Sequence, residues 1–191
     1  DLDLYVTVDF AVNPGRAFRY HDANDGGRNQ LFRNDGAWKF VEATEEAGLE
    51  TNNLRHSLAA AWEDYDNDGD LDIFLNNSNR PARLLRAEGE SGNHALMLRA
   101  VGTVSNRDGI GARITVTAGD LTQVKEVRSG SGYLSRGDIR VLFGLGTHAT
   151  AERVSVRWPS GLTERYEDVA AGQAVTLVEG KGIRDAAAFR E

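Results

Sequence analysis

Apolar and polar residues alternate along most of this 191-residue chain, and this period of two constrains its fold more than any other feature. In Leu2–Phe10 the even positions are apolar and most of the odd positions are polar. In "RVSVRW" the apolar residues Val154, Val156 and Trp158 share one face. Such alternation places the apolar side chains on one side of a β-strand. Clusters of Gly, Asn and Asp, typical of tight turns, separate the runs. The pattern therefore predicts an all-β protein.

Further strands are expected wherever the same alternation recurs. They are Trp38–Val41, Leu58–Trp62, Leu71–Leu75, Ala95–Ala100, Arg113–Ala118, Gln123–Arg128, Ile139–Phe143, Arg153–Trp158, Leu162–Tyr166 and Ala174–Val178. A single helical turn is expected at "TEEAGL", where Thr44 can cap the first turn and Gly48 can end it.

Charge is unevenly distributed between the two halves of the chain. The net charge is −7, made up of −9 over residues 1–90 and +2 over residues 91–191. This asymmetry suggests two units with different roles, and the acidic half would repel nucleic-acid phosphates, so nucleic acid is not an expected partner. The absence of cysteine excludes disulfides and thiolate metal sites. No apolar run approaches the ~18 residues of a membrane span.

A short internal repeat appears in the acidic half. "DLDLYV" (Asp1–Val6) matches "DLDIFL" (Asp70–Leu75), which lies 69 positions later. That spacing exceeds the ~40–50 residues of a propeller blade, and we place the surplus in the loop His21–Asn29. The first copy begins halfway through the motif. We therefore expect the chain to be the C-terminal part of a longer protein.

The second copy completes an acidic loop, "DYDNDGDLD", with five carboxylates in nine positions. Counted from Asp64 as position 1, the acids at positions 3, 5 and 9 are Asp66, Asp68 and Asp72, and position 6 is Gly69. Alternate residues of a curled loop point inward, and oxygen ligands at this spacing suit Ca²⁺, which takes six to eight of them at about 2.3–2.6 Å. Asp70, at position 7, is expected to contribute its backbone carbonyl. Mg²⁺ fits less well, because it demands a tighter octahedron and keeps more waters.

The loop has two other possible interpretations. An EF-hand is rejected because position 12 is Leu75 rather than Glu, and both flanks resemble strands. A solvated acidic turn without a metal stays open, since Asp and Gly are common in turns. The first copy of the repeat retains only Asp1 and Asp3, equivalent to positions 7 and 9, and two ligands rarely hold Ca²⁺ alone.

Beyond these spacings, the motifs resemble two known families. "DYDNDGDLDIFLNN", preceded by "NQLFRNDGAWKFVEATEEAGL", resembles the FG-GAP/VCBS repeats of calcium-binding β-propellers. "SNRDGIGARITV", "SGSGYLSRGD", "FGLG" and "VRWPSG" resemble the ASPIC/UnbV domain of cartilage acidic protein-like and enediyne-pathway UnbV-like proteins. The resemblance implies an all-β chain with partial β-propeller blades followed by a small β-sandwich-like domain. The expected divisions are residues 1–90 for about one and a half blades, 91–180 for ASPIC/UnbV, and 181–191 for a C-terminal tail.

The resemblance also implies a function. In such repeats aspartates bind Ca²⁺ within blade loops, which carries over to the metal ligands Asp64, Asp66, Asp68, Asp70 and Asp72. It supplies no catalytic residue. We expect a non-catalytic binding or scaffolding protein, secreted or periplasmic, whose partners are an unidentified protein or glycan and the upstream propeller blades. The first residues lack the features of a signal peptide, so secretion is inferred from the family alone. The alternative is an accessory or enzymatic role in bacterial enediyne-type biosynthesis.

Other motifs have simpler interpretations. The glycines of "GIGARI" and "GSGYLS" fit turns, because neither completes a dinucleotide-binding fingerprint or leads into a helix. No Ser lies in G-x-S-x-G, which argues against a hydrolase, and the His spacing does not suit zinc. Trp158 is expected to anchor the core, and Tyr133 is a candidate for partner contact. The residues that a hydrolase would use are Ser131, Ser135, Ser160, Asp138 and His148. The histidines considered for zinc are His21, His56, His94 and His148.

Overall fold

The computed structural model describes residues 3–7, 27–51, 57–78, 80–88, 92–130, 132 and 135–190. These residues form fourteen strands and no helix, so the predicted all-β class is confirmed for the described parts of the chain. The chain divides into two compact units. The first comprises residues 1–61, 73–85 and 132–135, and the second comprises residues 62–72, 86–131 and 136–191. None of the described residues builds a helix with the length and apolarity that crossing a bilayer requires.

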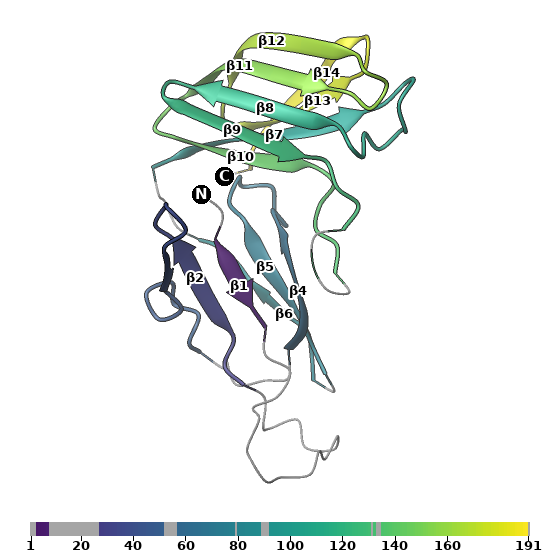
Figure 1. The fold of residues 1–191 in the computed structure, drawn as a ribbon. Coiled ribbons are helices and arrows are strands. Elements are labelled where there is room, and N and C mark those ends of the chain that lie inside the picture. Colours follow the sequence, from purple (N-terminus) through teal and green to yellow (C-terminus); the bar gives the residue numbers. More distant parts are fainter. Residues whose placement is uncertain are drawn as a thin grey trace. The chain divides into compact units, whose positions relative to one another are not determined.

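The first unit contains most of two three-stranded sheets, as expected for partial blades; the pairs β1–β2, β2–β3 and β5–β6 are antiparallel. One has the order β1-β2-β3, and the other has the order β4-β5-β6 (Figure 1). The strands are β1 (Leu4–Val6), β2 (Gln30–Asn34), β3 (Phe40–Glu42), β4 (Ser57–Glu63), β5 (Asp72–Asn77) and β6 (Arg83–Leu85). A buried chain of hydrogen bonds runs from Asn29 Nδ2 to Ser57 Oγ (2.8 Å) and from Ser57 Oγ to Asn77 Oδ1 (2.9 Å). These buried side chains therefore keep hydrogen-bond partners, and the free-energy cost of burying unpaired polar groups is avoided.

The second unit contains two four-stranded sheets that face each other (Figure 1). Their orders are β10-β7-β13-β14 and β12-β11-β8-β9; β7 and β13 run parallel, and the other pairs are antiparallel. The strands are β7 (His94–Val101), β8 (Arg113–Ala118), β9 (Leu121–Glu126), β10 (Val141–Gly146), β11 (Thr150–Arg157), β12 (Thr163–Ala170), β13 (Gln173–Val178) and β14 (Gly182–Ala188). This arrangement is the expected sandwich.

One hydrophobic core lies between these sheets, and both contribute to it. Leu98 and Phe143 enter it from one sheet, and Val116 and Val156 enter it from the other. Trp158, which the alternation placed in the core, is 1% exposed, and its indole N–H donates to Glu164 Oε2 at 2.6 Å. The alternating positions of the sequence therefore become the inner faces of the sandwich.

Side chains also join the edge strands of the two sheets. Lys125 Nζ on β9 donates to the carbonyl of Leu142 on β10 at 2.6 Å, and Gln123 Nε2 donates to the carbonyl of Gly144 at 2.5 Å. The Lys125 ammonium also lies 5.3 Å from the centre of the Phe143 ring, a cation–π distance. The carbonyls at the edge of β10 are thereby paired rather than left free.

Glu179, just after β13, is a buried carboxylate that fixes a distant loop. Its Oε2 accepts hydrogen bonds from the backbone N–H groups of Thr103, Val104 and Ser105 at 2.7–2.9 Å. Its Oε1 accepts from the hydroxyls of Ser105 and Ser160. Burial raises the pKa of this carboxyl, but the hydrogen bonds from Ser160, Ser105 and Thr103 outweigh burial and hold the pKa at about 2.

The observed strands differ from the predicted ones at several places. β2, β6 and β14 were not predicted, and β14 pairs with β13 within the segment expected as a tail. Trp38 was expected to begin a strand, which is wrong: it lies in a turn, is 90% exposed and has a φ of 62°. Gly36 and Ala37 also have positive φ, and the bond from Asp35 N to Lys39 O (2.9 Å) closes the turn. Period-two counting cannot detect such a turn, because Trp favours strands elsewhere.

The predicted helical turn at residues 44–49 is present as a set of turns rather than a helix. Ala47 N donates to the carbonyl of Ala43, four residues earlier, and Gly48 adopts a left-handed φ of 70° as its terminating role requires. Thr44 does not cap this turn, however. Its Oγ1 accepts from Leu31 N at 2.9 Å and thus ties the turn to β2.

Candidate metal site in the acidic loop

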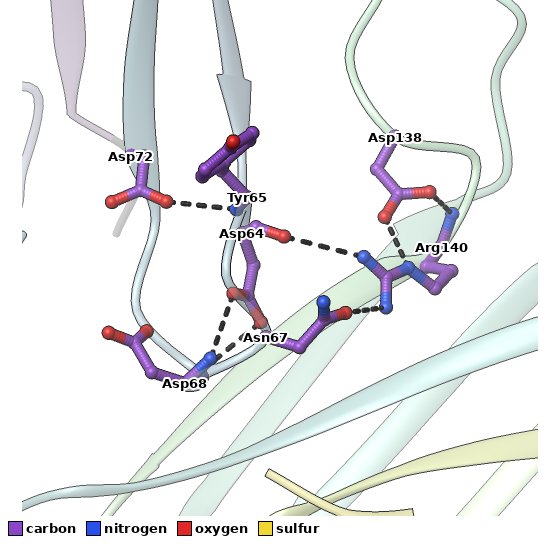
Figure 2. Close-up of polar contacts among 8 residues, drawn as sticks. Asp64, Tyr65, Asn67, Asp68, Asp72, Asp138 and Arg140 are labelled. Atoms are coloured by element: carbon purple, nitrogen blue, oxygen red, sulfur yellow. Dashed lines mark hydrogen bonds and ion pairs between the residues drawn. The ribbon is translucent and has the colours of Figure 1, made fainter. Parts of the chain in front are cut away.

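The acidic loop, residues 64–72, connects β4 to β5 and is curled by its own carboxylates. Asp64 is 1% exposed and accepts hydrogen bonds from the backbone N–H groups of Asp68 (3.1 Å) and Gly69 (3.2 Å). Asn67 and Gly69 have φ values of 64° and 96°, which Asn tolerates and Gly adopts without strain. These local bonds, drawn in Figure 2, bend the backbone so that the start and end of the loop approach each other.

Three of the five predicted ligands converge. Asp64, Asp66 and Asp72 each offer one carboxylate oxygen, and these three oxygens lie within 4.8 Å of one another. Asp72 is fixed by the N–H groups of Tyr65 and Ala87, each 2.9 Å from one of its oxygens. The convergence joins position 9 of the loop to positions 1 and 3, which is the arrangement that a single cation requires.

Asp66 provides the test of whether the donor set fits a metal. Both of its carboxylate oxygens are buried, and neither receives a hydrogen bond from a described residue. The guanidinium of Arg86 lies 2.6 Å from Oδ2, as an ion pair rather than a well-directed hydrogen bond. Arg86 supplies one positive charge beside a set of three converging carboxylates. An all-oxygen set with this excess of negative charge fits a hard divalent ion.

The electrostatics of the loop agree with this chemistry. Burial raises the pKa of the Asp64 carboxyl, and the charge of Asp68 raises it further, whereas the Gly69 N–H and the Arg140 guanidinium oppose the change. Burial also raises the pKa of Asp70, as do the charges of Asp68, Asp72 and Asp66. The carboxylates therefore repel one another in the folded chain, which a divalent cation among them would relieve.

The other two predicted ligands lie differently. The Asp68 carboxylate is outside the converging set and accepts a hydrogen bond from Asp70 N at 2.9 Å. Asp70 was expected to act through its carbonyl, and its carboxylate also lies outside the set. Three side chains thus come together among the described residues, and the sequence spacing alone did not distinguish them from Asp68.

The internal repeat has a structural counterpart. Asp3, just before β1, accepts from Asn34 N at 2.9 Å, just as Asp72 accepts from Ala87 N at 2.9 Å. In both copies the acid at position 9 thus accepts from a backbone N–H at or just beyond the end of the neighbouring strand: Asn34 ends β2, and Ala87 lies two residues after β6. Asp1, the other acid of the first copy, lies outside the described residues.

Arg140, which the sequence interpretation missed, contacts the loop from 73–76 residues away. Figure 2 shows its guanidinium reaching Asn67 Oδ1 at 2.6 Å and the backbone carbonyl of Asp64 at 3.4 Å. Asp138 orients Arg140 by an ion pair to Nε and by accepting from its backbone N–H at 2.9 Å. The sequence carries no pattern for this contact beyond an Asn at position 4, a residue type that tolerates the left-handed conformation.

A second site of chemical interest is an open cavity of about 680 Å³ in the second unit. Its lining includes Asp68, Asp70, His94, Lys125 and Arg190. Burial lowers the pKa of Lys125, and its ammonium donates to a backbone carbonyl. Charged groups of both signs therefore line a cavity of small-molecule size. The sequence did not identify Lys125 as a candidate site residue, because there it appears only as a polar residue of a predicted strand.

The residues weighed as a hydrolase set are held by other partners. Asp138 pairs with Arg140, Ser160 donates to Glu179, and His148 Nε2 lies 3.6 Å from Asp120 Oδ1. Ser135 forms a β-bridge with Gly132. Ser131, Tyr133, His21 and His56 lie outside the described residues.

The glycines of "GIGARI" lie in a turn, as predicted. Gly109 and Gly111 have φ values of 65° and 88°, and the chain continues into β8 rather than into a helix. An added Cβ at Gly109 would lie 2.8 Å from the carbonyl oxygen of Ala100, so a side chain there has no room. Close backbone approach thus explains this glycine without a nucleotide.

Two family models match this chain, and they follow one another along it in the same order as the two groups of motifs in the sequence. Residues 1–75 match the FG-GAP-like repeat, and residues 102–184 match the family described as ASPIC and UnbV. The expected division near residue 90 falls between the two matched ranges.

Two curated relatives are similar over a short stretch. Cartilage acidic protein 1 of Homo sapiens is 39% identical over 61 residues, and that of Mus musculus is 38% identical over 61 residues. Each match covers 32% of this chain and 9% of the relative's length. A putative cell adhesion protein from Bacteroides ovatus ATCC 8483 is 10% identical, covering 99% of this chain and 88% of its own, with a TM-score of 0.30. At that score nothing follows for fold or function.

Proposed function

Because the chain combines an FG-GAP-like repeat region with an ASPIC and UnbV domain, we propose that it is a non-catalytic, calcium-binding module that serves in binding or scaffolding. The observation that carries the proposal is the convergence of three carboxylates, Asp64, Asp66 and Asp72, whose oxygens lie within 4.8 Å of one another. Side chains of Asp64, Asp66 and Asp72 would hold the ion, with Asp68 and the carbonyl of Asp70 completing the oxygen set.

The role of the ion is structural. A bound Ca²⁺ would offset the mutual repulsion of the loop carboxylates. The loop joins β4 to β5 and also contacts Arg140, so fixing it holds both strands and the surfaces beside them. We also propose an extracellular or periplasmic location, where millimolar Ca²⁺ suits the weak affinities of extracellular modules. The partner is a protein or glycan, and upstream blades of a longer parent chain would extend the first unit.

The metal proposal is tested by thermal unfolding in Ca²⁺, in Mg²⁺ and in chelator. The double change Asp66→Ala, Asp68→Ala is expected to abolish the calcium-dependent rise in melting temperature. Asp108→Ala, Glu152→Ala is the matched control, because it removes two exposed acids outside the loop. Equal melting temperatures of the unaltered chain in Ca²⁺ and in chelator would refute a structural role for the ion.

A second candidate function is supported by the cavity that Lys125 lines. An accessory or enzymatic role in natural-product biosynthesis requires a pocket with polar groups and a perturbed acid or base. A lowered pKa leaves more of the Lys125 amine neutral and nucleophilic near pH 8. Trace acetylation with acetic anhydride would then label Lys125 faster than Lys39 and Lys181, the other lysines of the chain. Slower labelling of Lys125 at every pH would count against this role.

A further inference from the structure

The acidic loop belongs to the second unit, and other residues of that unit hold it at Asn67. Asn67 has a φ of 64°, in the left-handed region that non-glycine residues rarely adopt. Its side-chain oxygen accepts from Arg140 Nη1 at 2.6 Å, and its backbone carbonyl accepts from Arg190 N at 2.7 Å. Contacts from residues far along the chain thus stabilise a conformation that the loop would not favour alone.

The same guanidinium reaches the first ligand position. Arg140 Nη2 lies 3.4 Å from the backbone carbonyl of Asp64, while Asp138 accepts from the other side of the Arg140 side chain. Arg140 therefore spans positions 1 and 4 of the loop, as its planar fork of donors allows. It touches neither the carboxylate of Asp66 nor that of Asp72 in any recorded hydrogen bond or ion pair of the described residues.

We propose that Arg140 is a positioning residue of the metal site, which holds Asn67 and the Asp64 carbonyl so that the carboxylates converge. This inference rests on the proposed function. A loop released from Arg140 would spend less time in the converging conformation, and apparent affinity falls in proportion to the competent fraction. A fall of that fraction to about one tenth weakens Ca²⁺ binding about tenfold.

The positioning role and a purely electrostatic role predict opposite results. Arg140 is a positive charge near a site for a cation, so removing the charge alone would tighten Ca²⁺ binding. If positioning dominates, Arg140→Gln weakens binding despite the lost repulsion. Arg140→Lys keeps the charge but loses the two-pronged geometry, and it also weakens binding.

The test is calorimetric titration of the 191-residue chain with CaCl₂. Arg140→Gln is expected to bind about tenfold more weakly than the unaltered chain, and Arg140→Lys is expected to bind more weakly as well. Arg153→Gln is the matched control, because Arg153 is exposed and pairs only with Glu167 among the recorded ion pairs of the described residues. Equal or tighter binding by Arg140→Gln, relative to this control, would overturn the proposal.

A double-mutant cycle isolates the contact with Asn67. Asn67→Gly keeps the left-handed backbone accessible but removes the acceptor that Arg140 uses. If the two side chains act through one another, the double variant loses less than the product of the two single losses. Fully multiplicative losses would show that Arg140 does not act through Asn67 and would contradict the proposal.

Hydrogen exchange of backbone amides distinguishes coupling between the ion and the loop from a general stabilisation of the fold. If the loop conformation and the ion are linked, Ca²⁺ must also strengthen the contacts that the loop receives. The amide of Arg190, which donates to Asn67, should exchange more slowly in Ca²⁺, and the slowing should shrink in Arg140→Gln. The amide of Gly111, bonded to Val127 O within the sandwich, is the internal reference. Equal slowing at both amides would count against selective coupling.

The outcomes separate the two proposals. Failure of the unaltered chain to bind Ca²⁺ would refute the proposed function itself. Binding by the unaltered chain, with equal affinity in Arg140→Gln, would leave the metal site standing and refute only the positioning role.

Discussion

Neutralising Asp66 should stabilise the metal-free chain and remove its response to Ca²⁺, two effects of opposite direction. The Asp64, Asp66 and Asp72 oxygens lie within 4.8 Å of one another. Two like charges at about 4.8 Å repel by about 3.5 kcal/mol at an effective dielectric constant of ~20, and by about 0.9 kcal/mol in water. Asp66→Asn also loses the partly exposed ion pair with Arg86, which is worth about 0–1 kcal/mol. The expected net gain without metal is about 1–2 kcal/mol.

Calcium should reverse this order. At a free Ca²⁺ concentration of ~100 times the Kd, the unaltered chain gains about 2.7 kcal/mol, whereas Asp66→Asn gains little because one ligand charge is gone. For a chain of this size, 1 kcal/mol corresponds to about 2–4 °C in Tm. Differential scanning calorimetry in chelator and in excess Ca²⁺ would therefore show crossing Tm values, with Asp108→Asn as the exposed-acid control. A lower Tm for Asp66→Asn in chelator, or an undiminished calcium shift, would refute the reasoning.

Three further predictions concern parts of the fold outside this comparison. The pKa of the Glu179 carboxyl is about 2 in the folded chain, whereas its ordinary value is 4.5. As the pH falls, the unfolded chain therefore binds a proton at this group before the folded chain does. The contribution of Glu179 to stability should be full above pH ~4.5 and should be lost as the pH falls towards ~2. Urea unfolding across that range should show this loss, and Glu179→Gln should flatten it. Phe143→Ala should cost about 3–5 kcal/mol in urea unfolding at neutral pH, because the ring is fully buried in the sandwich core. Gly69→Ala should destabilise the chain by about 1–3 kcal/mol, because φ at this position is 96° and an added Cβ would lie 2.6 Å from the Phe189 ring. Adding Phe189→Ala should recover the steric part of this loss. Unchanged stability of Gly69→Ala in urea unfolding would contradict the geometry.

Much of the fold follows from local patterns. Alternation placed Val154, Val156 and Trp158 on one face, and that face is the inside of a sandwich. Short strands without clear alternation were missed: β2 and β6 contain charged residues and are paired mainly through their backbones. The turn at Trp38 was missed because three consecutive positive φ values depend on backbone closure between Asp35 and Lys39.

The metal site was likewise predictable from local patterns only in part. Spacing and Gly69 predicted a curled acidic loop, since both depend on backbone geometry within a few residues. Spacing did not separate Asp66 and Asp72, which converge with Asp64, from Asp68, which bonds the backbone of Asp70 instead. That choice depends on where β5 begins and on the N–H of Ala87, which holds Asp72 from 15 residues away.

The sequence by itself determined the all-β class, the faces of the main strands and the position of the acidic loop, because these depend on periods of two and on turn residues close in the chain. Only the tertiary structure decided that Arg140 holds Asn67, 73 residues away, and that Glu179 receives the N–H groups of the loop at Thr103, 76 residues away. Contacts of that separation arise from the packing of whole sheets. No local pattern of residues encodes which side chains such packing brings together.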